Sequence, residues 1–286
     1  MGIGVKAPTY PEGAMINKEK EASLKYIWAF EKVEDTLLLG TDPGGLFESD
    51  DEGKSFMLNK GLWNQPSRID WFGGGRDNPG IHSICINPNN TNHAYIGISC
   101  AGVFETVDAG DTWAPKNKGL KADFLPDPDA EIGQDPHLLV MNPNKPEILW
   151  QQNHCGIFKS DDAGQNWKDI SEKDGPANFG FAIELNPDNE NMAWVVPAVS
   201  DGVRVPIDGK LQVCRTDDGG ETWKSFASGL PKENAFDIVY RHCLRYNGDD
   251  LVFGTTTGNL FVSNDLGENW ECISNYLPMV YCVSFA

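Results

Sequence analysis

The chain has 286 residues, of which 42 are acidic and 23 basic, so its formal net charge is −19 at neutral pH. A surface of this sign repels nucleic-acid phosphates, and no local basic patch offsets it, which argues against a nucleic-acid partner. No run of about 18 apolar residues occurs, so we expect no membrane contact. Thirty glycines, nine tryptophans and fourteen phenylalanines are typical of short, aromatic-rich strands joined by tight turns.

The cysteines exclude two further classes of protein. All seven stand singly, with no Cys-x-x-Cys spacing, unlike a disulfide scaffold or a zinc ribbon. We therefore expect a cytoplasmic protein without a cofactor.

Along the chain, residues 1–25 have no apolar periodicity and predict an irregular connection. The strand-rich units that follow share one pattern: strand, turn, strand, loop, strand, turn, strand. In three of them an apolar strand runs into an Asn-Pro turn, at Asn87, Asn142 and Asn186. This pattern is typical of the four-stranded blade of a β-propeller. We predict an all-β, single-domain propeller over 1–286, with blades near 26–59, 81–117, 136–171, 180–227 and 238–274. The last residues, 279–286, predict a lone closing strand.

One octapeptide recurs in every predicted blade. Its pattern is [Ser/Thr]-x-Asp-x-Gly-x-[Ser/Thr/Asn]-[Trp/Phe], and it occupies 49–56, 106–113, 160–167, 216–223 and 263–270. Recurrence at intervals of about 50 residues is the signature of a repeat architecture.

The residue types of the octapeptide predict a structural turn between the two outer strands of each blade. The glycine permits positive φ, and the final aromatic residue anchors the next strand. The central aspartate can accept hydrogen bonds from backbone N–H groups of its own turn. These structural aspartates are Asp51, Asp108, Asp162, Asp218 and Asp265.

The octapeptides resemble the Asp-box, or bacterial neuraminidase repeat (BNR), of sialidases, sortilin-type receptors and the photosystem II assembly factor family. The stretches GVFETVDAGDTW, QQNHCGIFKSDDAG and GTTTGNLF further resemble bacterial WD40/YVTN/BNR-like "glycosyl hydrolase" proteins, over roughly residues 8–286. That resemblance implies a seven-bladed ring with further blades upstream. A longer propeller and a five-bladed variant both remain open.

The candidate ligand site lies where inner strands begin and where second strands run into third strands, since propellers usually bind ligands on that face. His82, His137 and Phe181 each stand five residues before the turn asparagine of their blade, so they begin equivalent inner strands. The tetrapeptide QQNH ends an otherwise apolar strand with polar side chains. The predicted ligand-binding residues are His82, His137, Gln152, Asn153, His154, Trp71 and Arg76.

These residues allow more than one chemistry. Three histidines could hold a metal, but their spacing fits no recognised metal motif, so we predict no metal site. The alternative is that they hydrogen-bond between blades and line a wet channel. The weak candidates for catalysis are Asp42, Asp135 and His137; two carboxyl groups could cleave a glycoside by acid–base chemistry. No sialidase triad can be assembled from the arginines and tyrosines.

Two hypotheses of different class follow. The first is a binding or scaffold propeller that presents its top face to a protein, peptide or glycan. The second is a glycoside hydrolase. A binding protein needs an aromatic and amide-rich surface, whereas a hydrolase needs two carboxyl groups about 5–9.5 Å apart across one cleft.

Overall fold

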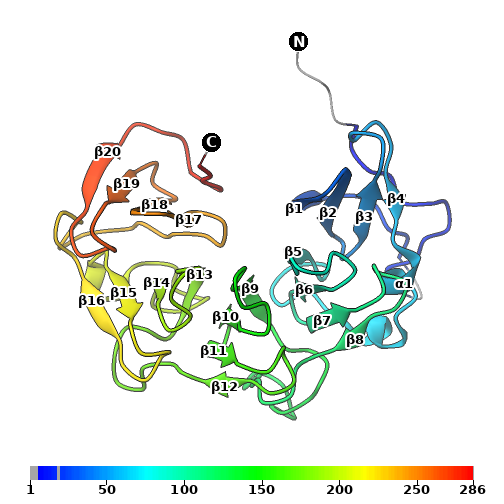
Figure 1. The fold of residues 1–286 in the computed structure, drawn as a ribbon, viewed down its shortest axis with the longest axis horizontal. Coiled ribbons are helices and arrows are strands. Elements are labelled where there is room, and N and C mark those ends of the chain that lie inside the picture. The colour runs from blue at the N-terminus through cyan, green and yellow to red at the C-terminus, as the bar shows by residue number, and fades with distance from the viewer. Residues whose placement is uncertain (1–5, 18–19, 286) are drawn as a thin grey trace. The chain divides into compact units, whose positions relative to one another are not determined.

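The computed structural model describes residues 6–17 and 20–285. Its strands form five four-stranded antiparallel sheets, each with its strands in sequence order (Figure 1). The all-β prediction of four-stranded blades is therefore confirmed. The chain divides after Leu139, within one strand of the third sheet, into two compact units.

The first unit contains two complete sheets, and two short helices lie between them in the sequence. The first sheet comprises β1 (Tyr26–Val33), β2 (Thr36–Asp42), β3 (Leu46–Ser49) and β4 (Met57–Leu58). The helices are α1 (Lys60–Trp63) and the 3-10 helix η1 (Pro66–Asp70). The second sheet comprises β5 (Ile81–Ile86), β6 (Ala94–Ile98), β7 (Gly102–Thr106) and β8 (Ala114–Pro115). The third sheet, in which the division falls, comprises β9 (Pro136–Met141), β10 (Leu149–Asn153), β11 (Gly156–Ser160) and β12 (Lys168–Asp169).

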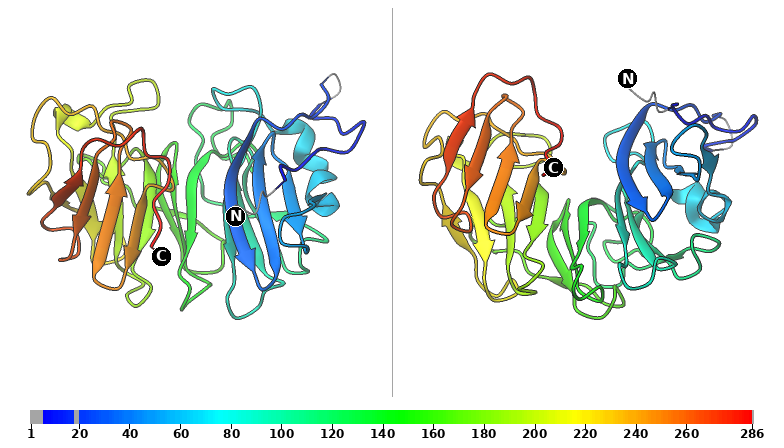
Figure 2. Two further views of the ribbon diagram at one scale, coloured as in Figure 1. Left: turned by 90° about the horizontal axis from the view of Figure 1, so that it is seen from above. Right: turned by 45° about the horizontal axis from the view of Figure 1, so that its top comes forward.

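The second unit contains the last two sheets, whose strands run side by side in both views of Figure 2. The fourth sheet comprises β13 (Gly180–Leu185), β14 (Ala193–Pro197), β15 (Val213–Thr216) and β16 (Lys224–Phe226), with the 3-10 helix η2 (Ile207–Gly209) in the loop after β14. The fifth comprises β17 (Leu244–Asn247), β18 (Asp250–Gly254), β19 (Leu260–Ser263) and β20 (Glu271–Ser274). None of the helices in the described part of the chain has the length and apolar character that spanning a membrane requires.

The second strands of the sheets are largely apolar because they are buried. Every residue of β14 is buried, and so is every residue of β6, because both faces of these strands are covered. In the second unit Trp194 of β14 belongs to one core cluster with Leu244 and Phe253 of the fifth sheet. Packing between sheets is close enough to require glycine: a Cβ on Gly40 would lie 2.6 Å from the carbonyl oxygen of Ile81.

The predicted boxes lie between the third and fourth strands of each sheet and share one hydrogen-bonded geometry. In the box of the third sheet, the Ser160 hydroxyl donates to Asp162 Oδ1 at 2.8 Å and accepts the Gly164 N–H at 2.9 Å. Asp162 also accepts the backbone N–H of Asn166 at 2.9 Å. The residue before the glycine adopts positive φ as well, which the sequence did not indicate: Ala163 has φ of 59°. The box is thus a turn with two left-handed residues.

The terminal segments are mostly irregular. Residues 6–17 and 20–25 make a single bridge, Met15 to Glu21, as expected for a connection. Residues 279–285, predicted as part of a closing strand, form no strand; residue 286 lies outside the described residues. Their backbone bonds go singly to Thr255 and His242 instead of along one neighbouring strand, and Val280 packs over Gly254.

Candidate functional site

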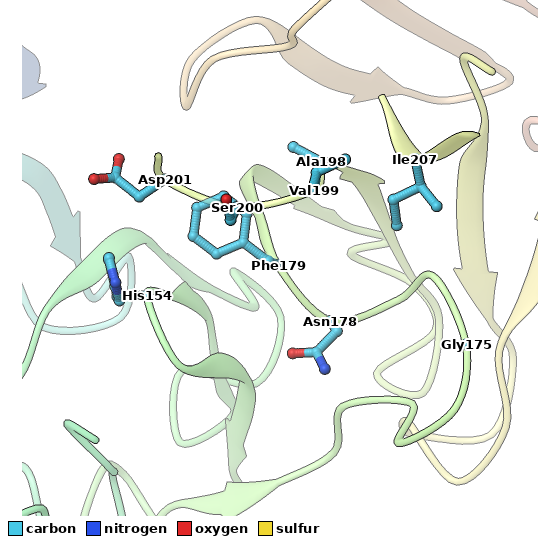
Figure 3. A pocket seen from close by; sticks show the side chains of 9 residues that line it. All are labelled: His154, Gly175, Asn178, Phe179, Ala198, Val199, Ser200, Asp201 and Ile207. Carbon is cyan, nitrogen blue, oxygen red and sulfur yellow. The ribbon is translucent and has the colours of Figure 1, made fainter. Parts of the chain in front are cut away.

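A pocket of about 390 Å³ lies within the second unit (Figure 3). It is formed by the β10–β11 loop, the segment that leads into β13, and the long loop after β14. Figure 3 shows His154 and Asp201 at one side and Ile207 at the other. The lining residues are His154, Gly175, Asn178, Phe179, Ala198, Val199, Ser200, Asp201 and Ile207.

The pocket combines apolar and hydrogen-bonding groups. Phe179 provides an aromatic ring, and His154 meets it edge to face with 5.8 Å between ring centroids. Asn178 and Ser200 offer an amide and a hydroxyl, and the side chain of Asn178 is exposed. Asp201 is the one carboxylate among the lining residues, and it is bonded to the guanidinium of Arg204. Convergent polar groups in a partly apolar hollow are typical of ligand sites.

An aromatic row continues from the pocket wall. Phe179 meets Phe181 at 5.5 Å between centroids, and Phe181 meets Tyr240 at 5.3 Å, both edge to face. Tyr240 then lies nearly parallel to Tyr281 at 6.4 Å, and Tyr281 is 67% exposed. Phe181 also belongs to a small buried cluster with Ala198 and Ile238.

Gln152 and Asn153 hold the loops of the site instead of entering the pocket. The Gln152 amide donates to the carbonyls of Asn153, Gly156 and Asn178 at 2.8–3.2 Å. Asn153 donates to the side chain of Gln151 and accepts the N–H of Cys155. Both amides are buried, and their hydrogen bonds fix the backbone beside His154 and Asn178.

In the first unit, Asp42 and Arg76 form a second polar group of side chains. Asp42 ends β2, is 3% exposed, and accepts a hydrogen bond from the Asn78 amide at 3.0 Å. Arg76 lies 3.7 Å from the other oxygen of Asp42, and its guanidinium stacks 4.3 Å from the centre of the Trp28 ring. These contacts hold the loop of residues 71–80 against the first sheet, so Asp42 has structural partners.

His82 and His137 occupy equivalent places, since each is the second residue of its inner strand, as predicted. Both are almost fully buried. His82 bonds through Nδ1 to the Ser83 hydroxyl at 2.9 Å, and its ring packs edge-on to Trp28. His137 Nε2 lies 3.8 Å from Asp135, whose other oxygen accepts the Cys100 N–H at 3.1 Å. The structure thus brings Asp135 and His137 together.

Trp71, which we predicted to bind the ligand, lies in a hydrophobic core cluster. Its side chain is 7% exposed and packs 5.1 Å from the Phe104 ring, in the core of the second sheet. The apolar residues of the second sheet bury the indole.

The pocket also contains residues that the sequence analysis missed. Asn178, Phe179, Ser200 and Asp201 belong to connections without a motif. For Ser200 and Asp201 the signal is length: the connection from β14 to β15 is longer than the corresponding connections of the other sheets and contains η2. Unusually long connections often carry function.

No protein-family model matches the chain. The chain is 28% identical over 210 residues to an oligoxyloglucan-reducing end-specific xyloglucanase of Emericella nidulans, covering 68% of this chain and 24% of that protein. It is 24% identical over 216 residues to the xyloglucanase Xgh74A of Acetivibrio thermocellus, covering 67% of this chain and 24% of that protein. It therefore spans about a quarter of the length of these curated relatives.

Comparison with a solved structure identifies the fold. An ancestral GH74 enzyme superposes with a TM-score of 0.63 at 18% identity, covering 88% of this chain and 33% of that one. The chain has a β-propeller fold. It is distantly related to the GH74 xyloglucanases, and the predicted similarity to glycosyl-hydrolase propellers is confirmed at that level.

Proposed function

We propose that this propeller binds a glycan in the pocket beside Phe179. The observation that carries the proposal is the composition of the pocket wall, in which one aromatic ring stands among an imidazole, an amide, a hydroxyl and a carboxylate. Sugars present hydroxyl groups at their edges and C–H groups on their faces, so such a wall can satisfy both. The volume of about 390 Å³ lies in the range of small-molecule sites.

The relatives support a glycan over other ligands. Both curated xyloglucanases are named for action on a polysaccharide, and the matched region covers two thirds of this chain. Distant relatives often share a fold but differ in the function of their sites. A glycan ligand is therefore a proposal for this chain.

Binding without hydrolysis fits the pocket better than catalysis. Glycoside hydrolysis needs two carboxyl groups that flank the bond. Asp201, the one carboxylate among the lining residues, forms an ion pair with Arg204, and the other lining groups are an imidazole, an amide, a hydroxyl and apolar side chains. The alternative, a glycoside hydrolase, is favoured by the names of the relatives, with Asp42 and Asp135 as its carboxyl candidates.

Calorimetric titration with xyloglucan oligosaccharides and other neutral β-glucan oligosaccharides tests the proposal. We expect saturable binding by the wild-type protein. The Asn178→Ala variant should bind about tenfold more weakly, because it loses a hydrogen bond to the sugar. Asn264→Ala is the matched control, since Asn264 is an exposed asparagine on an outer turn of the same unit.

A reducing-sugar assay on the same oligosaccharides separates the two hypotheses. Binding without release of new reducing ends agrees with the proposal. Release that is abolished by Asp135→Asn or Asp42→Asn would instead establish the hydrolase, and binding that is unchanged in Asn178→Ala would place the ligand elsewhere.

A further inference from the structure

We infer that the glycan site continues from the pocket to the exposed ring of Tyr281, which supports an outer sugar ring of a longer oligosaccharide. The inference rests on the proposed function and adds the length of the glycan and a residue that selects for it. Tyr281 is not among the lining residues, so a sugar that fills the pocket alone does not contact it.

Tyr281 presents its ring to solvent although the backbone on both sides of it is held in place. The side chain is 67% exposed. The N–H of Val280 donates to the carbonyl of Thr255 at 3.0 Å. The N–H of Val283 donates to the carbonyl of His242, also at 3.0 Å. An exposed aromatic ring on a fixed backbone binds a ligand at a small cost in conformational entropy.

The rings of the aromatic row lead from the pocket wall to Tyr281. Phe179 lines the pocket, and Phe181 and Tyr240 follow it in edge-to-face contacts. The rings of Tyr240 and Tyr281 then lie within 9° of parallel, with 6.4 Å between their centroids. Tyr281 is therefore connected to the pocket wall by ring contacts at every step.

A second series of contacts connects the pocket to Tyr281 along the surface. Asp201 lines the pocket and is paired with Arg204, and the side chains of both reach solvent. Burial lowers the pKa of Arg204, but a hydrogen bond with the Tyr240 side chain and the negative charge of Asp201 outweigh it, so the pKa is raised. Arg204 thus contacts both a lining residue and the ring partner of Tyr281. A glycan that leaves the pocket beside Asp201 meets this surface.

The chemistry of Tyr281 suits a sugar ring. The C–H face of a sugar packs against an aromatic face, and the phenol combines an apolar ring with a hydroxyl group that stays hydrated. A glycan that extends from the pocket therefore gains a contact that a shorter glycan does not make. We expect the affinity to rise with the number of sugar units until the chain reaches Tyr281.

The experiment measures, by calorimetric titration, the affinity for two series of neutral oligosaccharides of increasing length, the cello-oligosaccharides and the xyloglucan oligosaccharides. We expect the dissociation constant of the wild-type protein to fall about tenfold from the shortest to the longest member of a series, because one more ring is stacked. Tyr281→Ala should abolish this gain and leave the affinity for the shortest member within about twofold.

Two further variants identify the ring as the cause. Tyr281→Phe keeps the aromatic face and should keep the gain in affinity. Tyr276→Ala is the matched control, since Tyr276 is a 92% exposed tyrosine that precedes the same terminal segment, and it should behave as the wild-type protein. If Tyr281→Ala does not fold, Tyr281→Leu takes its place, because leucine removes the flat ring and keeps an apolar side chain.

The outcomes separate this inference from the proposed function. Wild-type affinity that is equal for every length, or a gain that persists without the Tyr281 ring, overturns the inference and leaves glycan binding in the pocket intact. Equal losses for short and long members in a folded Tyr281→Ala protein also overturn it, because Tyr281 would then support the pocket itself. A wild-type protein that binds neither series overturns both the inference and the proposed function.

Discussion

Asp162 holds both ends of Asn166: one carboxylate oxygen accepts the backbone N–H at 2.9 Å, and the other accepts the side-chain amide at 2.7 Å. The same two-point arrangement joins Asp51 to Ser55 and Asp218 to Thr222. The carboxylate therefore closes the turn that leads into the fourth strand. The role of this carboxylate is to stabilise the sheet, and it takes no part in the pocket.

Removing this carboxylate should destabilise the protein without changing ligand binding. Asp162→Ala loses three side-chain hydrogen bonds, and we expect a cost of about 1 kcal/mol or more, which lowers the melting temperature by about 2–4 °C. Differential scanning calorimetry measures the shift. The control is Asp174→Ala, an exposed aspartate of the same unit. Unchanged stability together with lost glycan binding would contradict the structural role.

The boxes should also make the fold sensitive to acid. Hydrogen bonds from Ser55 lower the pKa of Asp51 to about 2, and bonds from Asn166 lower the pKa of Asp162. At Asp218 and Asp265 slight burial acts in the opposite direction, but hydrogen bonds outweigh it and the pKa is again lowered. A lowered pKa in the folded state means that the stabilisation is fully present above the unfolded value of about 4 and is lost as pH falls towards 2.

We therefore expect the free energy of unfolding to fall as pH drops from about 5 to about 2. Denaturant titrations at a series of pH values measure it. Asp162→Asn should show a shallower decline than the wild-type protein, because it lacks one of the titrating groups. An identical slope in the two proteins would argue against the linkage.

Close packing of the first two sheets gives a third prediction. A methyl group on Gly40 would lie 2.6 Å from the Ile81 carbonyl oxygen and 2.7 Å from its Cγ2, so Gly40→Ala must push the sheets apart. We expect about 1–3 kcal/mol of destabilisation. Gly44→Ala is the control, since its nearest neighbour would lie at an ordinary 3.6 Å. Chemical denaturation compares the two, and equal midpoints would contradict the packing account.

Gln152 should act on the ligand through the loop it holds. Its amide donates to three carbonyls, including that of Asn178 at 2.8 Å, so Gln152→Leu removes all three hydrogen bonds. We expect about 1–3 kcal/mol of lost stability together with weaker glycan binding. Hydrogen exchange should show faster exchange in residues 176–180. A variant that binds normally with an ordered loop would refute this positioning role.

The blades could be predicted from sequence because each repeat carries its own turn chemistry. The serine or threonine, aspartate and glycine of a box specify the turn by local bonds alone, as at Ser160 and Gly164. The apolar strands before Asn87 and Asn142 specify inner strands in the same way. In each repeat the local preference and the overall fold therefore agree.

The site was less predictable because its residues depend on packing between loops. Sequence reasoning found His154 from its place after an apolar strand, but Trp71 was placed on a surface although the second sheet buries it. Asn178 and Ser200 carry no motif, and they reach one pocket because Gln152 and the loop after β14 hold their backbones. Such long-range constraints leave no periodic mark in the chain.

The central claim is that the pocket beside Phe179 binds a glycan. A microarray of neutral and acidic glycans, probed in parallel with the wild-type protein, Asn178→Ala and Asn264→Ala, tests it most directly. We expect a defined set of glycans bound by the wild-type protein and by Asn264→Ala, with signals about tenfold weaker for Asn178→Ala. A folded wild-type protein that binds no glycan, or an Asn178→Ala protein that binds the same set equally well, would contradict it.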